Sequence, residues 1–598
     1  MTRRIIRTLL IVLSVTALPS CLMGDEEIPS IDFGERVPEL QFRDIRGLDR
    51  SLSELGQHQA IVLVFTNTDC PLVRRTMPTL VRMHSELHSE GVCFVAVNTG
   101  PNDSIRDMAA QALEFDAPFY FVKDTDLSVT RTLGITKTPE VAVLNSQREL
   151  VYRGRINDQY RLGGARPRPT REDLKIALGE ILAGLPVTVA ETPVDGCLIT
   201  TPPGFSGPDP TYAEDIAPLV NDHCVRCHQP GTAAPFSLLS YNDVATHAAM
   251  IARVIEDQTM PPWYAHPDHG EFQNDPSLTR TERRRFIHWA TGQRLPGNLD
   301  ESPEPPAAAE SDWRIGPPDL VITMLEEHQI PATGFVDYRY SILPYIFLND
   351  TWVEAVEIRP DNREVVHHSN LAYVTAGGAG KETFVTGYVP GGQPVDLARF
   401  ESGVACKFPS GSGLGLQIHY TTTGRPERCR ISVGLRFAKQ VVRKQFRHFL
   451  LDPRFRIPPF DPAHAVSAST RLDRNATLLG LFTHMHVRGR DMTFMAIPPD
   501  GSTDVLLQIP NYNFDWQLGY EIPAGLKSYP AGTRIKAIAH FDNSSFNPYN
   551  PDPAREVRYG LQTVDEMFNG FGFYVDTDEN LNLKVDPKTG YVISGAGE

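Results

Sequence analysis

The first third of the chain alternates short apolar runs with helical patterns. Apolar runs occupy residues 60–65, 92–97, 119–122 and 141–144, and the segments between them repeat apolar residues at helical spacing, as at Leu80, Met83 and Leu87. Short apolar runs are typical of buried strands, and helical segments between them of helices that cover a sheet. The pattern predicts an α/β domain over residues 31–190.

The next segment favours helices alone. Helices at residues 212–220, 245–256 and 280–289, in a small all-α domain over residues 205–298, are what a family resemblance given below for this segment implies. A stretch rich in proline, glycine and threonine precedes it. Residues 299–318, which contain a run of prolines, alanines and acids, predict a linker after it.

Beyond residue 319 apolar and polar positions alternate with a period of two. The alternation is clearest at residues 356–359, 414–420, 478–488 and 535–539, with glycine and proline turns between such segments. Many short strands with such turns predict antiparallel β-sandwiches. The expected fold class is therefore multidomain: an α/β domain, a small all-α domain and an all-β C-terminal part.

Composition narrows the classes of function. A chain of 598 residues must hold several domains. The net charge of −16 argues against nucleic acid or an anionic membrane surface as a partner. Eight cysteines are too few for a disulfide scaffold, so each cysteine needs its own explanation.

Residues 1–21 have the pattern of a signal for export. Three arginines precede the apolar run 9–15, which is too short for a membrane span. The ending Leu18-Pro19-Ser20-Cys21 resembles a bacterial lipobox, which implies lipidation of Cys21, although Pro19 is unusual there and simple secretion remains an alternative. We expect an exported protein of the periplasm or outer surface, attached to the membrane only through a lipid anchor.

A haem attachment motif lies in the predicted all-α domain. Cys224-Val225-Arg226-Cys227-His228 is a Cys-x-x-Cys-His sequence, in which two thioethers hold the haem and the histidine binds its iron. The segment resembles a small cytochrome c with one haem c. Met260 is the expected second axial ligand, and His266 and His269 are its competitors.

The α/β domain resembles the thioredoxin and peroxiredoxin superfamily. Cys70-Pro71 follows a strand and opens a helix, and Pro139 precedes another strand; the resemblance implies that Pro139 is cis. A helix start lowers the pKa of a thiol, so Cys70 is a candidate redox thiol. The second cysteine of a Cys-x-x-Cys motif is missing. Cys93 or Cys197 could resolve Cys70, and the alternative is a structural or docking role.

Two histidines lie close together in a predicted strand. Side chains alternate between the faces of a strand, so His484 and His486 point to the same side. Such a pair presents two imidazoles to a transition metal, and imidazole suits copper, zinc, iron or nickel. Alone, this spacing is more often two ordinary histidines.

Other potential metal ligands elsewhere in the chain support a metal-binding role for this pair of histidines. His367-His368, His419, His484-x-His486 and Met567 occur in the order found in the type II copper, ascorbate-dependent monooxygenases, which include the peptidylglycine α-hydroxylating and dopamine β-monooxygenases. About the last 280 residues resemble this family. The resemblance implies two β-sandwich domains, at 319–458 and 459–598, with a boundary near Pro458-Pro459.

The resemblance also implies the ligands of two copper ions. His367, His368 and His419 would hold an electron-transfer copper, and His484, His486 and Met567 the copper that meets oxygen. His367 and His368 can both bind only at a strand end or a bulge, since neighbours in a strand face opposite ways. The animal relatives have many more cysteines.

A disulfide is a further expectation for the all-β part. Cys406 and Cys429 flank the His419 strand at similar distances. In an oxidising compartment, a bond between them would brace that strand.

The expected function is a copper monooxygenase that uses O₂ to hydroxylate a C–H bond of a small molecule or peptide. Electrons would pass through haem c from ascorbate or a redox protein. The alternatives are a thiol or haem peroxidase and a non-catalytic electron-transfer or copper-binding protein of the cell envelope. A structural role of the histidines is the least favoured interpretation. The sequence does not identify the substrate, because the loops that would line its pocket carry no readable motif.

Overall fold

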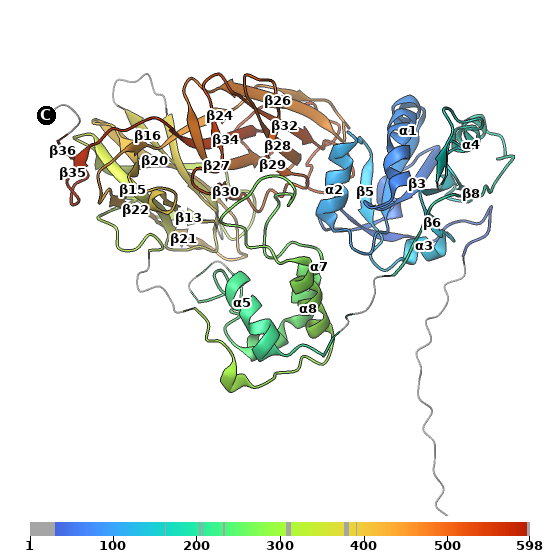
Figure 1. Ribbon diagram of the computed structural model, residues 1–598, viewed down its shortest axis with the longest axis horizontal. Helices are drawn as coiled ribbons and strands as arrows, with labels where there is room; N and C mark the ends of the chain where they lie inside the picture. Colours follow the sequence, from blue (N-terminus) through green and yellow to red (C-terminus); the bar gives the residue numbers. More distant parts are fainter. Residues whose placement is uncertain are drawn as a thin grey trace, which may run out of the picture.

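The computed structural model describes residues 30–594, apart from 162, 202–204, 206, 231, 233, 307–312, 376–381 and 390–391. The predicted signal segment 1–21 and Cys21 lie outside the described residues. Figure 1 shows an α/β unit in blue, a helical unit in green and two β units coloured yellow to red. Among the helices of the described residues, none is long and apolar enough to cross a membrane.

The α/β unit is built on a seven-stranded sheet in the order β2-β1-β5-β4-β3-β7-β8. The central strands β3, β4 and β5 are parallel, while β7 runs antiparallel to β3. All seven side chains of β3 and of β4 are buried, which explains their continuous apolar sequence. The strands are β1 (Gln41–Asp44), β2 (Asp49–Ser51), β3 (Ala60–Thr66), β4 (Val92–Asn98), β5 (Tyr120–Lys123), β7 (Glu140–Asn145) and β8 (Leu150–Gly154).

Helices cover both faces of this sheet, and the unit extends further than predicted. The helices are α1 (Pro71–Leu87), α2 (Ile105–Glu114), α3 (Ser128–Thr132) and α4 (Asp173–Leu182). The short strand β11 (Cys197–Leu198) pairs antiparallel with β6 (Lys137–Thr138), which precedes the cis bond between Thr138 and Pro139. The unit therefore ends near residue 199, not at residue 190, because the last segment adds a strand beside β6.

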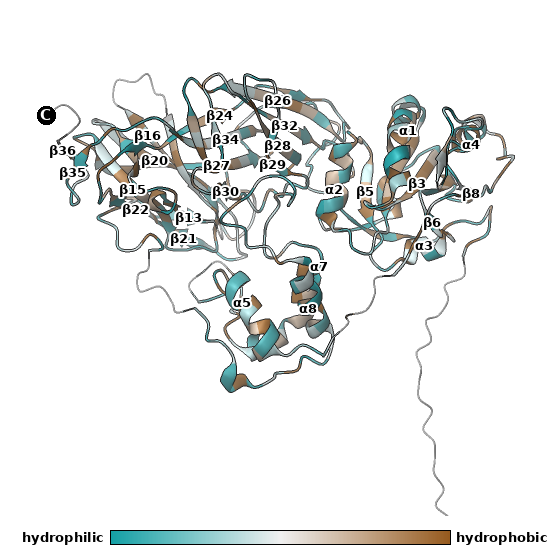
Figure 2. Ribbon diagram, in the orientation of Figure 1, coloured by the Kyte–Doolittle hydropathy of each residue, from teal (hydrophilic) through white to brown (hydrophobic). Residues whose placement is uncertain are grey.

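The helical unit packs its helices around one small core. In Figure 2 its helices carry both brown and teal stretches, as expected for helices with one buried face. Predicted helices at 212–220, 245–256 and 280–289 all appear. The elements are η3 (Tyr212–Ile216), α5 (Ala217–His223), α6 (Tyr241–Thr246), α7 (Ala248–Glu256) and α8 (Arg280–Thr291).

The first β unit encloses a core between a larger and a smaller sheet. The larger sheet has the order β12-β22-β15-β19-β23 with β18 beside β15, and the smaller has the order β14-β20-β16-β17. Its strands are β12 (Leu320–Thr323), β13 (His328–Ile330), β14 (Arg339–Ile346), β15 (Thr351–Pro360), β16 (Val366–Thr375), β17 (Glu382–Tyr388), β18 (Val395–Asp396), β19 (Val404–Phe408), β20 (Ser412–Tyr420), β21 (Glu427–Cys429), β22 (Ile431–Phe437) and β23 (Lys444–Gln445).

The second β unit repeats this arrangement. One sheet has the order β24-β34-β27-β30 with β31 beside β27, and the other β26-β32-β28-β29. Its strands are β24 (Arg447–Leu451), β25 (Arg456–Ile457), β26 (His464–Arg471), β27 (Ala476–Met485), β28 (Gly489–Ile497), β29 (Asp504–Ile509), β30 (Gly519–Glu521), β31 (Ser528–Tyr529), β32 (Arg534–Phe541), β33 (Val557–Arg558) and β34 (Phe568–Asp576).

The boundary between the β units differs from the one predicted near Pro458-Pro459. Strand β24 precedes these prolines and already pairs with β34 of the second unit. At the other end, the hairpin of β35 (Lys584–Val585) and β36 (Val592–Ser594) returns to the first unit, where Leu583 pairs with Val442. Prolines mark a turn here rather than the change of sheet, which depends on long-range pairing.

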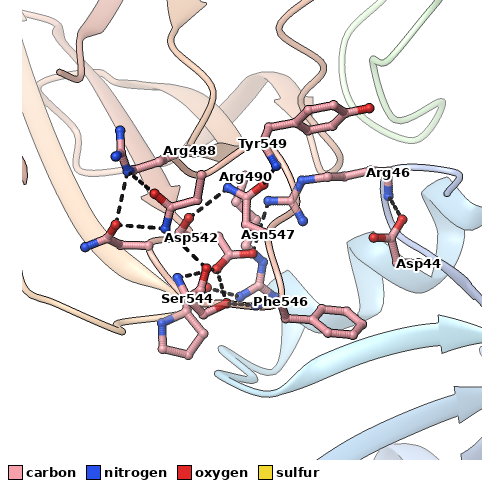
Figure 3. Close-up of polar contacts among 12 residues, drawn as sticks. Asp44, Arg46, Arg488, Arg490, Asp542, Ser544, Phe546, Asn547 and Tyr549 are labelled. Carbon is pink, nitrogen blue, oxygen red and sulfur yellow. Dashed lines mark hydrogen bonds and ion pairs between the residues drawn. The ribbon is translucent and has the colours of Figure 1, made fainter. Parts of the chain in front are cut away.

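Two contacts fix the other units to the second β unit. Trp263 and Tyr264, which follow α7, are buried in the core of the second β unit. The loop after β32 reaches the α/β unit, where Phe546 is buried in the α/β core, 4.3 Å between ring centroids from Tyr120. Figure 3 shows this loop, in which Asp542 forms a buried ion pair with Arg46 at 3.1 Å.

Candidate functional site

The first histidine group lies where the start of β16 pairs with the end of β20 in the first β unit. His368 on β16 pairs with His419 on β20, and the register shifts between Val366 and His368. His367 is the extra residue of this β-bulge, which confirms the expectation that neighbouring histidines need such an irregularity to point the same way. Ligand atoms of His367, His368 and His419 all lie within 4.8 Å of one another.

The second group lies at the end of β27 in the second β unit. His484 is in the strand and His486 follows it. The antiparallel ladder pairs His484 with Asn569 and Met485 with Phe568, so the next register position places Met567 opposite His486. Met567 is half-buried there. The rings of His484 and His486 lie 5.1 Å apart, and the strand register brings the backbone of Met567 to the same end of the two strands.

Both groups belong to one cluster that crosses the boundary between the β units. The ring centroid of His368 lies 5.1 Å from that of His419 and 5.9 Å from that of His484. His484 lies 5.1 Å from His486. The sequence resemblance assigns the histidines to two copper ions with separate roles, whereas in the structure contacts between neighbouring rings link all five into one cluster.

The charge state of these imidazoles suits a metal. Burial lowers the pKa of His419 and of His484 to about 4 and that of His486 to about 3, and His368 is lowered well below its usual value. Neutral imidazole is the form that binds metals.

Three buried ring nitrogens have no hydrogen-bond partner among the described residues: Nε2 of His367, Nδ1 of His419 and Nε2 of His486. The donor set therefore fits copper or another imidazole-binding metal.

Neighbouring side chains orient the rings, and the sequence had not indicated them. The Tyr338 hydroxyl lies 3.1 Å from His368 Nε2, and Gln517 Oε1 lies 2.7 Å from His484 Nδ1. Phe514 stacks on His367 with ring centroids 5.2 Å apart. Such contacts fix the tautomer and direction of a metal-binding histidine. All three residues lie in loops without a recognisable motif.

A buried carboxyl group supports the turn after β27. Glu566 accepts hydrogen bonds from the backbone amides of His486, Arg488 and Met567. Burial raises its pKa to about 7, against the opposing effect of these amides. Glu566 therefore ties the strand with His484 to the segment with Met567, and the positions of both depend on it.

The haem attachment motif follows α5 in a short turn. Cys224, Cys227 and His228 are all partly exposed. His228 Nδ1 lies 3.1 Å from the carbonyl oxygen of Phe236, which leaves Nε2 free to bind iron. The residues present thus fit a covalently attached haem.

A large cavity connects this motif with the histidine cluster. The cavity has a volume of about 1040 Å³ and is lined by Cys224, Cys227, His228 and Met260 on one side and by His367 and Asp515 on the other. His266 and His269, the competitors of Met260, do not line it. The cavity lies between the helical unit and both β units, with apolar residues such as Ile251 and Leu481 in its wall.

The thiols separate into a close pair and isolated ones. Cys70 Sγ lies 2.8 Å from Cys197 Sγ. Cys93 is buried in the cluster on the other face of the sheet, where burial raises its pKa to about 12. Of the two sequence candidates for resolving Cys70, the structure brings only Cys197 to it.

The predicted disulfide between Cys406 and Cys429 is not formed in the structure. Both residues are free cysteines, on β19 and β21, which belong to different sheets. The Cys429 thiol donates instead to the carbonyl oxygen of Asn362 at 3.7 Å. Flanking a strand at similar distances in sequence did not place the two sulfurs together, because their strands pair with different partners.

Comparison with known families identifies the α/β unit. Residues 33–161 match the family model for redoxin. The chain therefore contains an N-terminal redoxin, or thioredoxin-like, domain, followed after the helical unit by a large all-β region of several antiparallel sheets. The comparison with curated proteins finds no match.

Three solved structures that resemble this chain each cover less than a third of it. A hypothetical protein from Sinorhizobium meliloti is 26% identical, with 29% of this chain and 97% of that chain covered and a TM-score of 0.27. An uncharacterised conserved protein from Geobacillus kaustophilus is 28% identical, with 29% and 94% covered and a TM-score of 0.27. The thioredoxin domain of a thiol-disulfide oxidoreductase from Bacteroides vulgatus is 19% identical, with 21% and 89% covered and a TM-score of 0.19.

Proposed function

We propose that this protein is a copper-dependent monooxygenase that receives electrons through a covalently attached haem c. The observation that carries the proposal is the cluster of four buried histidines and the partly exposed His367, which borders a cavity lined by the haem attachment motif. With copper bound, such a site supplies the one-electron and O₂ chemistry that places one oxygen atom in a C–H bond and reduces the other to water. Two outside electrons and two protons are needed for each turnover.

The protein's own residues would prepare the site for this chemistry. Burial lowers the pKa of His419 and of His484 to about 4, so these two imidazoles bind a metal ion without first losing a proton at physiological pH. Tyr338 and Gln517 hold the rings of His368 and His484 in a fixed direction. Five imidazoles and the Met567 thioether supply enough ligands for two copper ions, and a soft thioether favours Cu(I).

The arrangement of the units would serve electron delivery. Cys224 and Cys227 would hold the haem in the cavity whose opposite wall contains His367. Met260 begins the loop that leads to Trp263, and Trp263 is buried in the second β unit. The haem pocket is thereby held against the β units, which removes the need for a diffusing electron carrier at this step. Ascorbate or a redox protein remains the proposed donor to the haem.

Metal analysis of the full chain tests this proposal. Protein exported from a host that attaches haem c should contain copper and one haem. His484→Ala/His486→Ala should lose copper and keep the haem, and His464→Ala, a histidine of the same β unit outside the cluster, should lose neither. Copper that is absent from the wild type, or unchanged in the double variant, would refute the proposal.

Thiol chemistry is a second candidate function, favoured by the redoxin match and by the short distance between Cys70 and Cys197. In this case the protein is a thiol-based redox protein or peroxidase, and the β units bind a partner. A peroxide-consumption assay tests the thiol-based candidate. If the thiol is the reactive centre, Cys70→Ser should abolish peroxide consumption and His484→Ala should spare it.

A further inference from the structure

The segment that follows the redoxin domain lies on the surface of that domain and carries a cysteine to its candidate thiol. The backbone amide of Arg153 donates to the carbonyl oxygen of Ala190, and the backbone amide of Thr192 donates to the carbonyl oxygen of Arg153. Lys137 Nζ donates to the carbonyl oxygen of Val194 at 2.9 Å. Further along, Ile199 donates its backbone amide to Thr136. Cys197 is therefore held on both sides, and its position beside Cys70 is part of the fold.

The two thiols have different surroundings. Cys70 is 1% exposed and stands at the N-cap position of α1, whereas Cys197 is partly exposed. Burial alone would raise the pKa of Cys70, but the neighbouring Cys197 thiol and the nearby backbone amides at the helix start bring it below its usual value. Burial and the neighbouring Cys70 raise the pKa of Cys197. Cys70 is thus the better nucleophile at neutral pH.

We propose that Cys70 and Cys197 form a reversible dithiol–disulfide pair that exchanges electrons with a cysteine pair of another protein. Cys70 is the attacking thiol and Cys197 the resolving one. This inference rests on the thiol-based candidate function above and is independent of copper and haem. It assigns the role of the missing second cysteine to a residue 127 positions away in sequence.

The thiol–disulfide exchange takes place in two steps, in which atoms and electrons balance. Cys70 thiolate attacks one sulfur of the partner's disulfide, which forms a mixed disulfide and releases the partner's first thiol after it takes up a proton. Cys197 then loses its proton and attacks Cys70 Sγ, which forms the Cys70–Cys197 disulfide and releases the partner's second thiol. Two electrons and two protons pass to the partner, and a dithiol protein reverses the reaction.

The local β-pairing indicates what kind of partner fits. Strand β11 has only two residues, and its Leu198 side chain is 69% exposed. In the described pairings, β6 has no other neighbour than β11. The chain's own Cys197 thus shows how an extended cysteine-bearing segment lies on β6 with its sulfur at Cys70. A partner segment that displaces β11 would gain the same backbone pairing, which favours a protein disulfide over a small thiol.

Alkylation and mass spectrometry of the full chain test the pair, with oxidised glutathione as the probe. The wild type should form the Cys70–Cys197 disulfide and keep no glutathione. Cys197→Ser should retain one glutathione on Cys70, and Cys70→Ser should acquire much less on Cys197 at pH 7. Cys93→Ala, which removes an isolated buried thiol, should behave as the wild type.

Failure of the pair and failure of the thiol-based function give different results. If wild-type Cys70 keeps glutathione without linking to Cys197, the pair is wrong but a reactive single thiol survives. If Cys70 reacts neither with oxidised glutathione nor with hydrogen peroxide, both the pair and the thiol-based function are wrong. Titration of the oxidised wild type with dithiothreitol tests the pair without any variant, since two thiols must appear together at Cys70 and Cys197.

Discussion

The imidazole of His368 on β16 lies 5.9 Å between ring centroids from that of His484 on β27, so a strand of each β unit contributes to one histidine cluster. His368 is 3% exposed and His484 8% exposed. Bound copper ions would therefore share a buried space instead of occupying two independent sites. This relationship leads to the first prediction.

Two Cu(II) ions held by this cluster should interact magnetically. We expect the oxidised, fully loaded protein to show a weakened or broadened electron paramagnetic resonance signal, with less spin than its copper content. His368→Ala should remove part of the copper and restore an isolated-ion signal from what remains. Two full, independent spins per chain in the wild type would contradict the single cluster.

Met260 should control the haem potential if it is the second axial ligand. Met260→Ala should lower the reduction potential, because a methionine ligand raises it. His266→Ala is the matched control, since His266 does not line the cavity, and it should leave the potential unchanged. The measurement is a redox titration followed by the haem absorbance. An unchanged potential in Met260→Ala would assign the ligand to another residue.

Phe546 should hold the redoxin domain to the second β unit. Its ring is 3% exposed in the core of that domain, and the Arg50 guanidinium lies 3.8 Å from the ring centroid. Phe546→Ala should cost about 3–5 kcal/mol of docking free energy, as for other buried phenylalanines. Faster proteolysis at the domain junction and earlier elution in size-exclusion chromatography would report the loss.

A conservative substitution of Phe546 distinguishes lost packing at the domain contact from a general loss of stability. Phe546→Leu keeps much of the buried apolar surface and should show a smaller effect than Phe546→Ala. Equal proteolysis rates in the wild type and Phe546→Ala would mean that the polar contacts of Arg46 and Arg50 suffice for docking.

Acid should weaken the metal-free histidine cluster. The pKa of His419 and of His484 is about 4 in the folded protein and near 6.5 when unfolded. Between pH 6.5 and 4 the unfolded chain binds protons that the folded chain does not. The free energy of unfolding therefore falls by about 1.4 kcal/mol per pH unit for each such histidine, and no further loss from these groups occurs below pH 4.

Hydrogen exchange on β16, β20 and β27 can localise this effect. Protection of these strands should decline from pH 6.5 to 4.5, after correction for the intrinsic exchange rate. His419→Gln and His484→Gln should each show a weaker pH dependence, because glutamine does not titrate. The same dependence in the variants and the wild type would refute this assignment of the acid sensitivity.

Local patterns in the sequence predicted much of the fold and part of the site. The buried strands β3 and β4 follow from their continuous apolar runs, and α1 from the helical spacing of Leu80, Met83 and Leu87, since such patterns relate residues only a few positions apart. The bulge at His367 also followed from strand geometry. The haem motif is readable for the same reason, because its three residues lie within five positions.

Only the tertiary structure decided which distant residues meet. Cys197 reaches Cys70 because β11 pairs with β6, and nothing in the sequence near Cys197 favours it over Cys93. The merging of the histidines into one cluster depends on how two cores pack across a boundary that the prolines did not mark. Sequence spacing determined which side chains share a strand face, whereas the contacts between units follow from the burial of surfaces whose partners lie hundreds of residues away.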